Sequence, residues 1–171
     1  IVLQMEIPYE TVSYICDFAS KHNKQIMLNV APAVVLDHDI MRKIDILVVN
    51  ETEAELISGE SISSIGEEAV VDKLRSLGAK NVVLTLGKKG SILKNDQQYL
   101  SVHAFTVDAV DTTAAGDTFC GALAAGLSKG HSCHQAMHFA SAASAICVTR
   151  MGAQTSIPFE SEVENFLSKN I

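Results

Sequence analysis

Apolar residues along the chain form short continuous runs and longer segments with helical spacing. The continuous runs predict buried strands, since parallel strands covered on both faces lose the usual alternation, at 1–3, 25–28, 45–49 and 82–85. Helical spacing predicts helices over 9–21, 39–43, 50–57, 67–77, 116–129, 132–149 and 160–168. Residues 91–94 and 99–105 predict a hairpin that turns at Asn95 and Asp96.

The order of these segments predicts the fold class. Strands that alternate with helices favour a layered α/β/α domain with a mostly parallel sheet and right-handed crossovers. We interpret residues 1–171 as part of one such domain. Ligands of these sheets bind beyond the carboxyl ends of the strands, and four polar residues fall at or just after predicted strand ends: Glu6, Asn50, Thr85 and Asp111. A ligand site is therefore expected at that edge of the sheet.

Composition narrows the classes of partner. The chain has 171 residues, of which 47% are hydrophobic and 19% charged, and its net charge is −7. A negative protein is a poor surface for nucleic acid, so a nucleic-acid partner is not expected. No apolar run reaches the roughly 18 residues of a membrane helix, so we expect no membrane partner. The four cysteines lack C-x-x-C spacing, which is typical of a protein from the reducing cytoplasm.

The stretch from Asp111 to Leu123 is the strongest candidate for chemistry. Three small residues, Ala114, Ala115 and Gly116, stand where a loop is predicted to become a helix. Amide groups at a helix start lack internal partners, so an anion could approach them closely. Asp117 follows in the first turn, where it could accept a proton from a hydroxyl that attacks a phosphate. The alternative is that the aspartates only cap the helix and complement its dipole.

The other candidate motifs in the sequence have simpler structural interpretations. The chain contains no G-x-G-x-x-G and no P-loop. The letters G-x-S-x-G occur at 126–130, but they fall at the end of a predicted helix rather than at a strand-to-helix turn, so no hydrolase nucleophile elbow is expected. From composition alone, residues 86–90 are a strand-to-hairpin turn with two solvated lysines. Of His131, His134 and His138, the last two are one helical turn apart and could share a face, but a zinc site would need a third ligand and usually a nearby glutamate, and neither is evident. All three are therefore interpreted as surface or packed histidines. Residues 50–53 form either a helix cap or a carboxylate site for Mg²⁺.

The stretch from Asp111 to Leu123 resembles the second motif of the ribokinase-like (PfkB-type) sugar kinases, D-T-x-[GA]-A-G-D-x-F. Further similar stretches occur in the same order along nearly the whole chain, at 3–6, 28–33, 49–55, 84–90 and 145–158. The resemblance covers only the carboxyl-terminal part of such a kinase. We therefore expect that a longer protein contains the amino-terminal strands, the β lid and a glycine-rich sugar-binding motif.

The resemblance also implies roles for individual residues. Asp117 is the expected general base on the sugar hydroxyl, and Ala114, Ala115 and Gly116 the expected anion hole. Glu6 and Asp117 are expected to contact the sugar. The residues expected to contact or border the nucleotide are Asn50, Thr85, Leu86, Gly87, Lys88, Lys89, Gly90, Gly116 and Ser141. One departure from the family is Ala114, where many relatives have glycine.

Two kinds of cation are implied in the same way. Glu53 is expected to help place Mg²⁺ through water. A loop for K⁺, partly built from backbone carbonyls, is expected at Asp111, Thr113, Cys147, Arg150, Gly152 and Ser156. A monovalent cation there would add positive charge behind the anion hole.

The expected function is therefore ATP-dependent phosphorylation of a sugar primary hydroxyl, with D-ribose converted to D-ribose 5-phosphate. Other kinases of the family stay open as alternatives, namely a fructokinase, a deoxyribokinase or a nucleoside kinase. An alternative from a different class of function is a nucleotide-binding fragment without catalytic activity. We expect the 171 residues alone to be inactive. Relatives often dimerise through the lid, so a homodimer of the intact cytoplasmic enzyme is expected.

Overall fold

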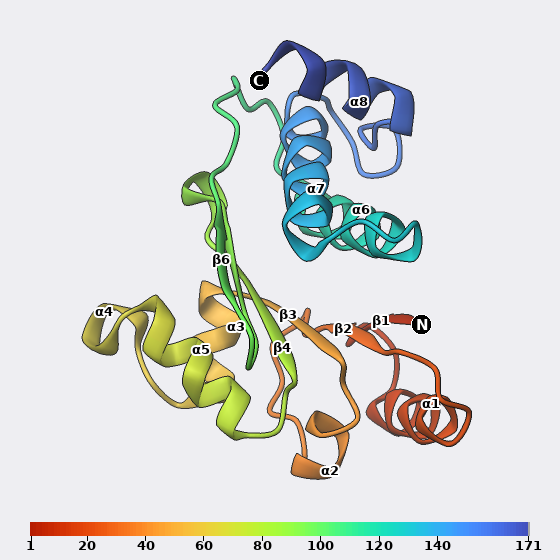
Figure 1. The fold of residues 1–171 in the computed structure, drawn as a ribbon, viewed down its shortest axis with the longest axis vertical. Coiled ribbons are helices and arrows are strands. Elements are labelled where there is room, and N and C mark those ends of the chain that lie inside the picture. Colours follow the sequence, from red (N-terminus) through yellow and green to blue (C-terminus); the bar gives the residue numbers. More distant parts are fainter. Residues whose placement is uncertain (171) are drawn as a thin grey trace. The chain divides into compact units, whose positions relative to one another are not determined.

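A computed structural model of the chain describes residues 1–170 and confirms the α/β fold class (Figure 1). Its strands lie side by side in one sheet in chain order: β1 (Val2–Gln4), β2 (Met27–Asn29), β3 (Ile46–Asn50), β4 (Asn81–Thr85), β5 (Ser91–Lys94) and β6 (Tyr99–Val102). The pairs β1–β2, β2–β3 and β3–β4 are parallel. A turn over residues 95–98 joins β5 to β6 as a hairpin, closed by the Asn95 amide donating to the Gln98 carbonyl at 3.1 Å.

The helices follow the strands in the order that the sequence predicts. They are α1 (Tyr9–Lys21), α2 (His38–Met41), α3 (Glu51–Ser58), α4 (Ile62–Ile65), α5 (Glu67–Ser76), the 3₁₀ turn η1 (Gly87–Lys89), α6 (Ala115–Ser128), α7 (Cys133–Val148) and α8 (Glu160–Lys169). The chain divides into two compact units. The first comprises residues 1–86 and 92–100, and the second comprises residues 87–91 and the described chain from Ser101 onward.

The first unit is organised around β3 and β4. The central residues of both strands, at 47–49 and 82–84, are buried. Both faces of these strands are covered, which is why their sequences are continuous apolar runs. From α1 the core receives Val12, Cys16 and Ala19, which recur at helical spacing. This packing holds the carboxyl ends of four parallel strands at one edge.

The second unit is a helical layer. α6 and α7 pack side by side along their length, and α8 packs on α7 (Figure 1). Small residues permit the close crossing, because a Cβ at Gly126 would lie 3.1 Å from the Cβ of Ala136. A separate apolar cluster contains Ala142, Ala143 and Ile146 of α7 with Val163 of α8.

Three details differ from the sequence-based expectation. The short helix α4 was not predicted, since four residues are too few to show a helical period. The second hairpin strand ends at Val102 rather than Phe105, because Phe105 instead packs edge-on against Phe166 with ring centroids 5.1 Å apart. Asp111 follows no strand, so its expected place at a strand end is wrong; residues 103–114 form an irregular connection.

Among residues 1–170, no helix combines the length and the apolar character that crossing a bilayer requires.

The buried β4 strand yields a stability prediction. Leu84 is fully buried in the first unit, so Leu84→Ala should lower the free energy of unfolding by about 2–5 kcal/mol through lost burial and a residual cavity. The matched control is Leu56→Ala, because Leu56 on α3 is 49% exposed and should cost less than about 1 kcal/mol. Urea unfolding followed by circular dichroism measures both values. Equal losses in the two variants would contradict the assigned core.

Candidate active site

The start of α6 has an unusual backbone. Ala114 precedes the helix in the left-handed conformation, with φ 59° and ψ 11°. Left-handed backbone is uncommon outside glycine, because the Cβ crowds the following carbonyl. The Ala115 amide donates to the Thr112 carbonyl at 3.2 Å and the Thr118 amide to the Ala114 carbonyl at 2.9 Å. The chain thus turns sharply into the helix immediately before Gly116 and Asp117.

Gly116 and Asp117 are both solvent-exposed in the first turn of this helix. Among the described residues, no heavy atom other than those of adjacent or same-helix backbone lies within 4 Å of the position that a Cβ on Gly116 would occupy. The positive end of the helix dipole is therefore open to an anion. Asp117 places a carboxylate beside that opening, an arrangement suited to removing a proton next to a bound phosphoryl group.

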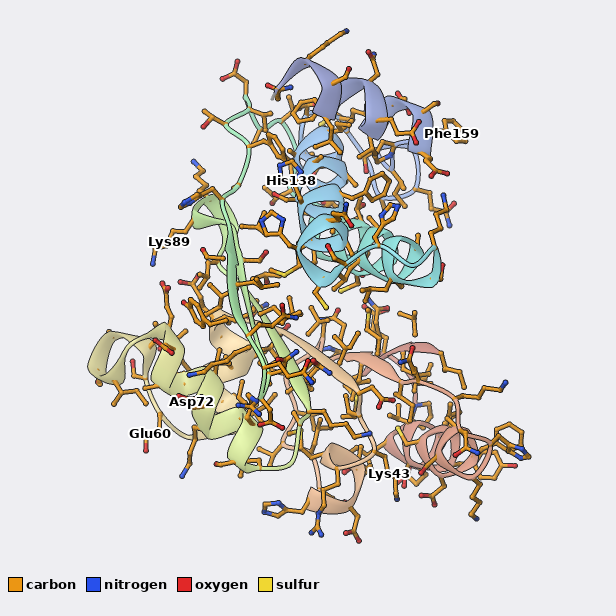
Figure 2. The ribbon with its side chains drawn as sticks, in the orientation of Figure 1. Lys43, Glu60, Asp72, Lys89, His138 and Phe159 are labelled. Carbon is orange, nitrogen blue, oxygen red and sulfur yellow. The ribbon has the colours of Figure 1, made fainter. Side chains whose placement is uncertain are left out.

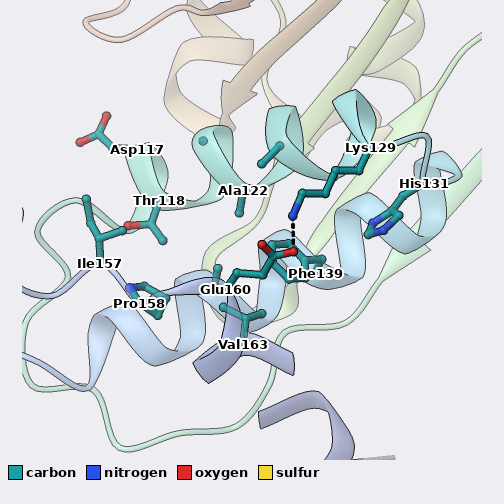
Figure 3. Close-up of a pocket in the computed structure, with 14 residues that line it drawn as sticks. Asp117, Thr118, Ala122, Lys129, His131, Phe139, Ile157, Pro158, Glu160 and Val163 are labelled. Atoms are coloured by element: carbon teal, nitrogen blue, oxygen red, sulfur yellow. Dashed lines mark hydrogen bonds and ion pairs between the residues drawn. The ribbon is translucent and has the colours of Figure 1, made fainter. Parts of the chain in front are cut away.

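A pocket of about 270 Å³ begins at Asp117 and runs along α6. Its lining comes from α6, α7, α8 and the two connections between them. The remaining lining residues are Thr118, Gly121, Ala122, Ala125, Gly126, Lys129, His131, Phe139, Ala143, Ile157, Pro158, Glu160 and Val163. An ion pair between Lys129 and Glu160 lies at the far end from Asp117 (Figure 3). The hydroxyl of Thr118 is buried, and within residues 1–170 it has no hydrogen-bond partner.

Asp111 links two segments that are far apart in the sequence. Its Oδ1 accepts the Thr113 amide at 2.9 Å, and its Oδ2 accepts the Gly152 amide at 3.0 Å. Hydrogen bonds from the Thr113 side chain, the Gly152 amide and the Thr113 amide lower the pKa of Asp111 to about 2. The carboxylate is therefore charged at neutral pH and ties the turn before α6 to the loop after α7.

Gly152 is required where it stands. Its φ is 93°, and a Cβ at this position would lie 2.6 Å from Oγ1 of Thr155. The glycine lets the loop bring its amide to Asp111 in a conformation that L-residues rarely adopt.

Cys147 and Ser156 form the buried side of the same loop. The Cys147 Sγ lies 3.2 Å from Oγ of Ser156 and 3.7 Å from the Thr113 carbonyl. The Ser156 hydroxyl also lies 2.8 Å from the Ala153 carbonyl, to which it can donate. The structure thus brings together five of the six residues expected in the cation loop, namely Asp111, Thr113, Cys147, Gly152 and Ser156.

Arg150, the sixth expected residue, directs its side chain elsewhere. Its Nη2 donates to Oε1 of Glu162 at 2.6 Å, in the first turn of α8. Glu162 was not singled out from the sequence, since twelve residues separate it from Arg150 and no motif joins the two. Only the backbone of Arg150 remains beside the loop, where its amide donates to the Cys147 carbonyl at 3.0 Å.

In the first unit, Asn50 and Glu53 form a reciprocal helix cap at the start of α3. The Asn50 Oδ1 accepts the Glu53 amide at 2.9 Å, while Glu53 Oε2 accepts the Asn50 amide at 2.7 Å and Oε1 accepts its Nδ2 at 2.9 Å. Burial raises the pKa of Glu53, partly offset by the hydrogen bond from the Asn50 backbone. Both carboxylate oxygens are engaged, so the cap interpretation is realised here. A cation would be reached only through remaining lone pairs and water.

Thr85 lies directly across from Asn50 at the ends of β4 and β3. Its hydroxyl is 3.4 Å from the Val49 carbonyl. Glu6 is exposed just after β1, at the same edge of the parallel strands. The first unit therefore collects Glu6, Asn50 and Thr85 at the carboxyl ends of its strands, as the strand order predicts.

The turn after β4 begins with buried Leu86 and continues as η1 through Gly87, Lys88 and Lys89. Gly90 ends it with φ 109°, and a Cβ there would lie 2.0 Å from the Val102 carbonyl. Lys89 projects from this turn (Figure 2).

Ser141 and the clustered histidines belong to α7 and its surroundings. Ser141 is buried, with its hydroxyl 3.3 Å from the His103 carbonyl. The rings of His134 and His138 stack with centroids 6.3 Å apart, and His138 also contacts Phe105 at 5.2 Å. Within the described part of the chain, no three His, Cys, Asp or Glu side chains gather in an arrangement that could hold a metal ion.

The comparisons with known proteins all point to one family. The model of the pfkB family carbohydrate kinases matches residues 2–160. A ribokinase of Staphylococcus aureus (strain COL) is 40% identical over 167 residues, which cover 95% of this chain and 54% of the relative. A deoxyribokinase of Salmonella typhi is 37% identical, with 99% of this chain and 56% of the relative covered.

A solved structure of Arabidopsis thaliana ribokinase, complexed with ribose and ATP, superposes with a TM-score of 0.92 at 32% identity. It matches 97% of this chain and 55% of its own. The chain thus spans about half the length of the relatives that it matches. Because the family model covers nearly the whole sequence, this chain belongs to the pfkB family of carbohydrate kinases.

Proposed function

We propose that this chain supplies the nucleotide-binding and phosphoryl-transfer side of an ATP-dependent sugar kinase that converts D-ribose to D-ribose 5-phosphate. The observation that carries the proposal is the position of Asp117, one residue after exposed Gly116 at an open helix start. Relatives named ribokinase and a ribokinase structure with ribose and ATP support the choice of sugar and nucleotide. The chain spans about half the length of these relatives, so the rest of the sugar site would come from a part of the kinase outside these 171 residues.

The proposed reaction needs little covalent work from the protein. The Gly116 amide, with the helix dipole, would stabilise charge on the transferred phosphoryl group, and the small side chains of Ala114 and Ala115 would let that group approach closely. Asp117 would accept the proton of the attacking primary hydroxyl, while Glu6 would orient the sugar. At the ends of β3 and β4, Asn50 and Thr85 would contact the nucleotide. The turn from Leu86 to Gly90 would border it, as would Ser141.

Cations would supply the remaining charge compensation. The residues around Asp111 suit a hard monovalent cation such as K⁺, because they offer an ionised carboxylate, a hydroxyl and backbone carbonyl oxygens. Such an ion adds positive charge behind the phosphoryl site when bound. Glu53 has both oxygens in the helix cap, so it fits an outer, water-mediated contact to Mg²⁺ rather than direct ligation.

A second candidate function is phosphorylation of another pentose derivative. The deoxyribokinase from Salmonella typhi is 37% identical to this chain, against 40% for the Staphylococcus aureus ribokinase. Both activities are tested on a full-length version that contains the part of the kinase outside this chain. We expect ribose to give the highest kcat/KM in a panel with 2-deoxyribose, fructose and nucleosides. A better value for any other member would overturn the ribose assignment, and activity of the 171 residues alone would contradict the divided sugar site.

The role of Asp117 yields a prediction that separates chemistry from folding. In the full-length version, Asp117→Asn should lower kcat by about 10² or more while ATP affinity changes little, because the amide cannot accept the proton. Asparagine keeps the size and much of the local hydrogen bonding, so the melting temperature should change little. Kinetics, ATP titration and a thermal melt measure the three quantities. Near-normal turnover with lowered stability would instead assign Asp117 to the helix dipole alone.

The strained backbone of Ala114 yields a prediction on stability. Ala114→Gly should raise the free energy of unfolding by about 0.5–1 kcal/mol, since relief of left-handed strain exceeds the entropic cost of glycine. Phosphate binding at the helix start should persist in this variant. The matched control is Ala122→Gly inside α6, which should instead destabilise by about 1 kcal/mol. Denaturant unfolding of the chain decides, and destabilisation by both changes would contradict the left-handed assignment.

A further inference from the structure

Two carboxylates hold the start of the loop between α7 and α8. The Asp111 carboxylate, before α6, accepts the Gly152 amide. Glu162, in the first turn of α8, accepts a hydrogen bond from the Arg150 guanidinium at 2.6 Å. The same short stretch, residues 150–152, is therefore held from two different parts of the chain.

Glu162 makes a second contact that joins the loop to the helix. Its Oε2 accepts the amide of Phe159, the residue that precedes α8, at 2.8 Å. The Phe159 side chain itself is 79% exposed and points outward from the helix start (Figure 2), so it provides little anchoring. The Arg150 guanidinium and the Phe159 amide, in that order, lower the pKa of Glu162, and the group is charged at neutral pH.

The helix that carries Glu162 is itself held in place. Val163, the next residue, is 1% exposed and packs in the cluster with Ala142, Ala143 and Ile146 of α7. Phe166 adds an edge-on contact with Phe105. Glu162 therefore acts from a rigid support rather than from a mobile surface, which is what a residue that orients another needs.

The backbone held by Arg150 belongs to the cation loop. The Arg150 amide donates to the Cys147 carbonyl, and two residues later Gly152 donates to Asp111. Small shifts of this stretch would move the carbonyl oxygens that face a bound ion. Cation affinity and selectivity depend on the number and placement of such oxygens.

We propose that Glu162 is a positioning residue that, through Arg150, sets the affinity of the cation loop for K⁺. The inference rests on the cation loop of the proposed function and extends it to Glu162, a residue outside the loop that contacts Arg150. Partners in the outer shell of a metal site orient the inner ligands in the same way, and their loss typically weakens the metal by about 10–100-fold.

Glu162→Gln tests this, because glutamine keeps an oxygen to accept the Phe159 amide but loses the charge that holds Arg150. The melting temperature of the 171-residue chain is measured as KCl replaces NaCl at constant ionic strength. A bound ion stabilises the folded state by RT ln(1 + [K⁺]/Kd), so the rise of the melting temperature with the K⁺ concentration gives an apparent Kd for K⁺. In Glu162→Gln this Kd should rise about tenfold. Circular dichroism in NaCl checks that the variant is folded.

Glu160→Gln is the matched control. Glu160 lies on the same helix and pairs with Lys129, away from the loop (Figure 3), so its loss should leave the Kd within about twofold. A second variant, Arg150→Lys, keeps the positive charge and the backbone but not the planar guanidinium, and should weaken K⁺ to a similar extent as Glu162→Gln. It also tests the proposal if Glu162→Gln fails to fold.

The outcomes separate this inference from the proposed function. A K⁺ response in the parent chain, with the same Kd in Glu162→Gln and Glu160→Gln, would overturn the positioning role alone. No K⁺ response in the parent chain would overturn the cation loop and the positioning role together, while the Asp117 prediction would stand unaffected.

Discussion

The second unit depends on one carboxylate, that of Asp111. It accepts amides from Thr113 and Gly152, which are separated by 39 positions in the sequence but belong to the turns that precede α6 and follow α7. The Val110 and Asp111 amides add hydrogen bonds to the Val148 carbonyl at 2.7 and 3.1 Å, so the entry of the chain into α6 is tied to the end of α7. The Cys147 and Ser156 contacts complete the same junction from its buried side. The position of Gly116 and Asp117 follows from it, since both come directly after the held turn.

The junction contains backbone that is unfavourable for its residues. Ala114 adopts a left-handed conformation in which alanine costs energy, and among residues 1–170 no side chain caps the helix that it begins. Strained backbone of this kind concentrates at functional sites, where surrounding contacts overdetermine it. Here the strain has a local benefit, because a side-chain cap would occupy the amides that an anion needs. Under the proposed function, an open helix start with a carboxylate in its first turn would combine anion binding and proton removal in four residues.

Much of this arrangement could be predicted from the sequence because it depends on local rules. Helical spacing predicted α1, α6, α7 and α8 to within a few residues, and continuous apolar runs predicted β3 and β4. A helix cap was one of the two interpretations of residues 50–53, and the structure shows it as a capping box between residues only three positions apart. The motif around Asp117 resembled the family that the comparisons then showed.

Long-range side-chain contacts could not be predicted in this way. The pairing of Arg150 with Glu162 depends on how α8 packs against α7, which no short pattern encodes. Phe105 continued the apolar pattern of β6, yet tertiary packing against Phe166 took it out of the strand. The buried hydroxyl of Thr118 likewise follows from the position of α8 and the preceding loop rather than from α6 itself.

The central claim is that the start of α6 binds the phosphoryl group that is transferred, and backbone NMR of the ¹⁵N-labelled chain tests it most directly. Titration with ADP and Mg²⁺, followed by inorganic phosphate, should shift the amide resonances of Ala115, Gly116 and Asp117. The nucleotide step should also shift those near Asn50 and Thr85. Shifts confined to other parts of the chain, with the start of α6 unmoved at saturating nucleotide and phosphate, would contradict the claim.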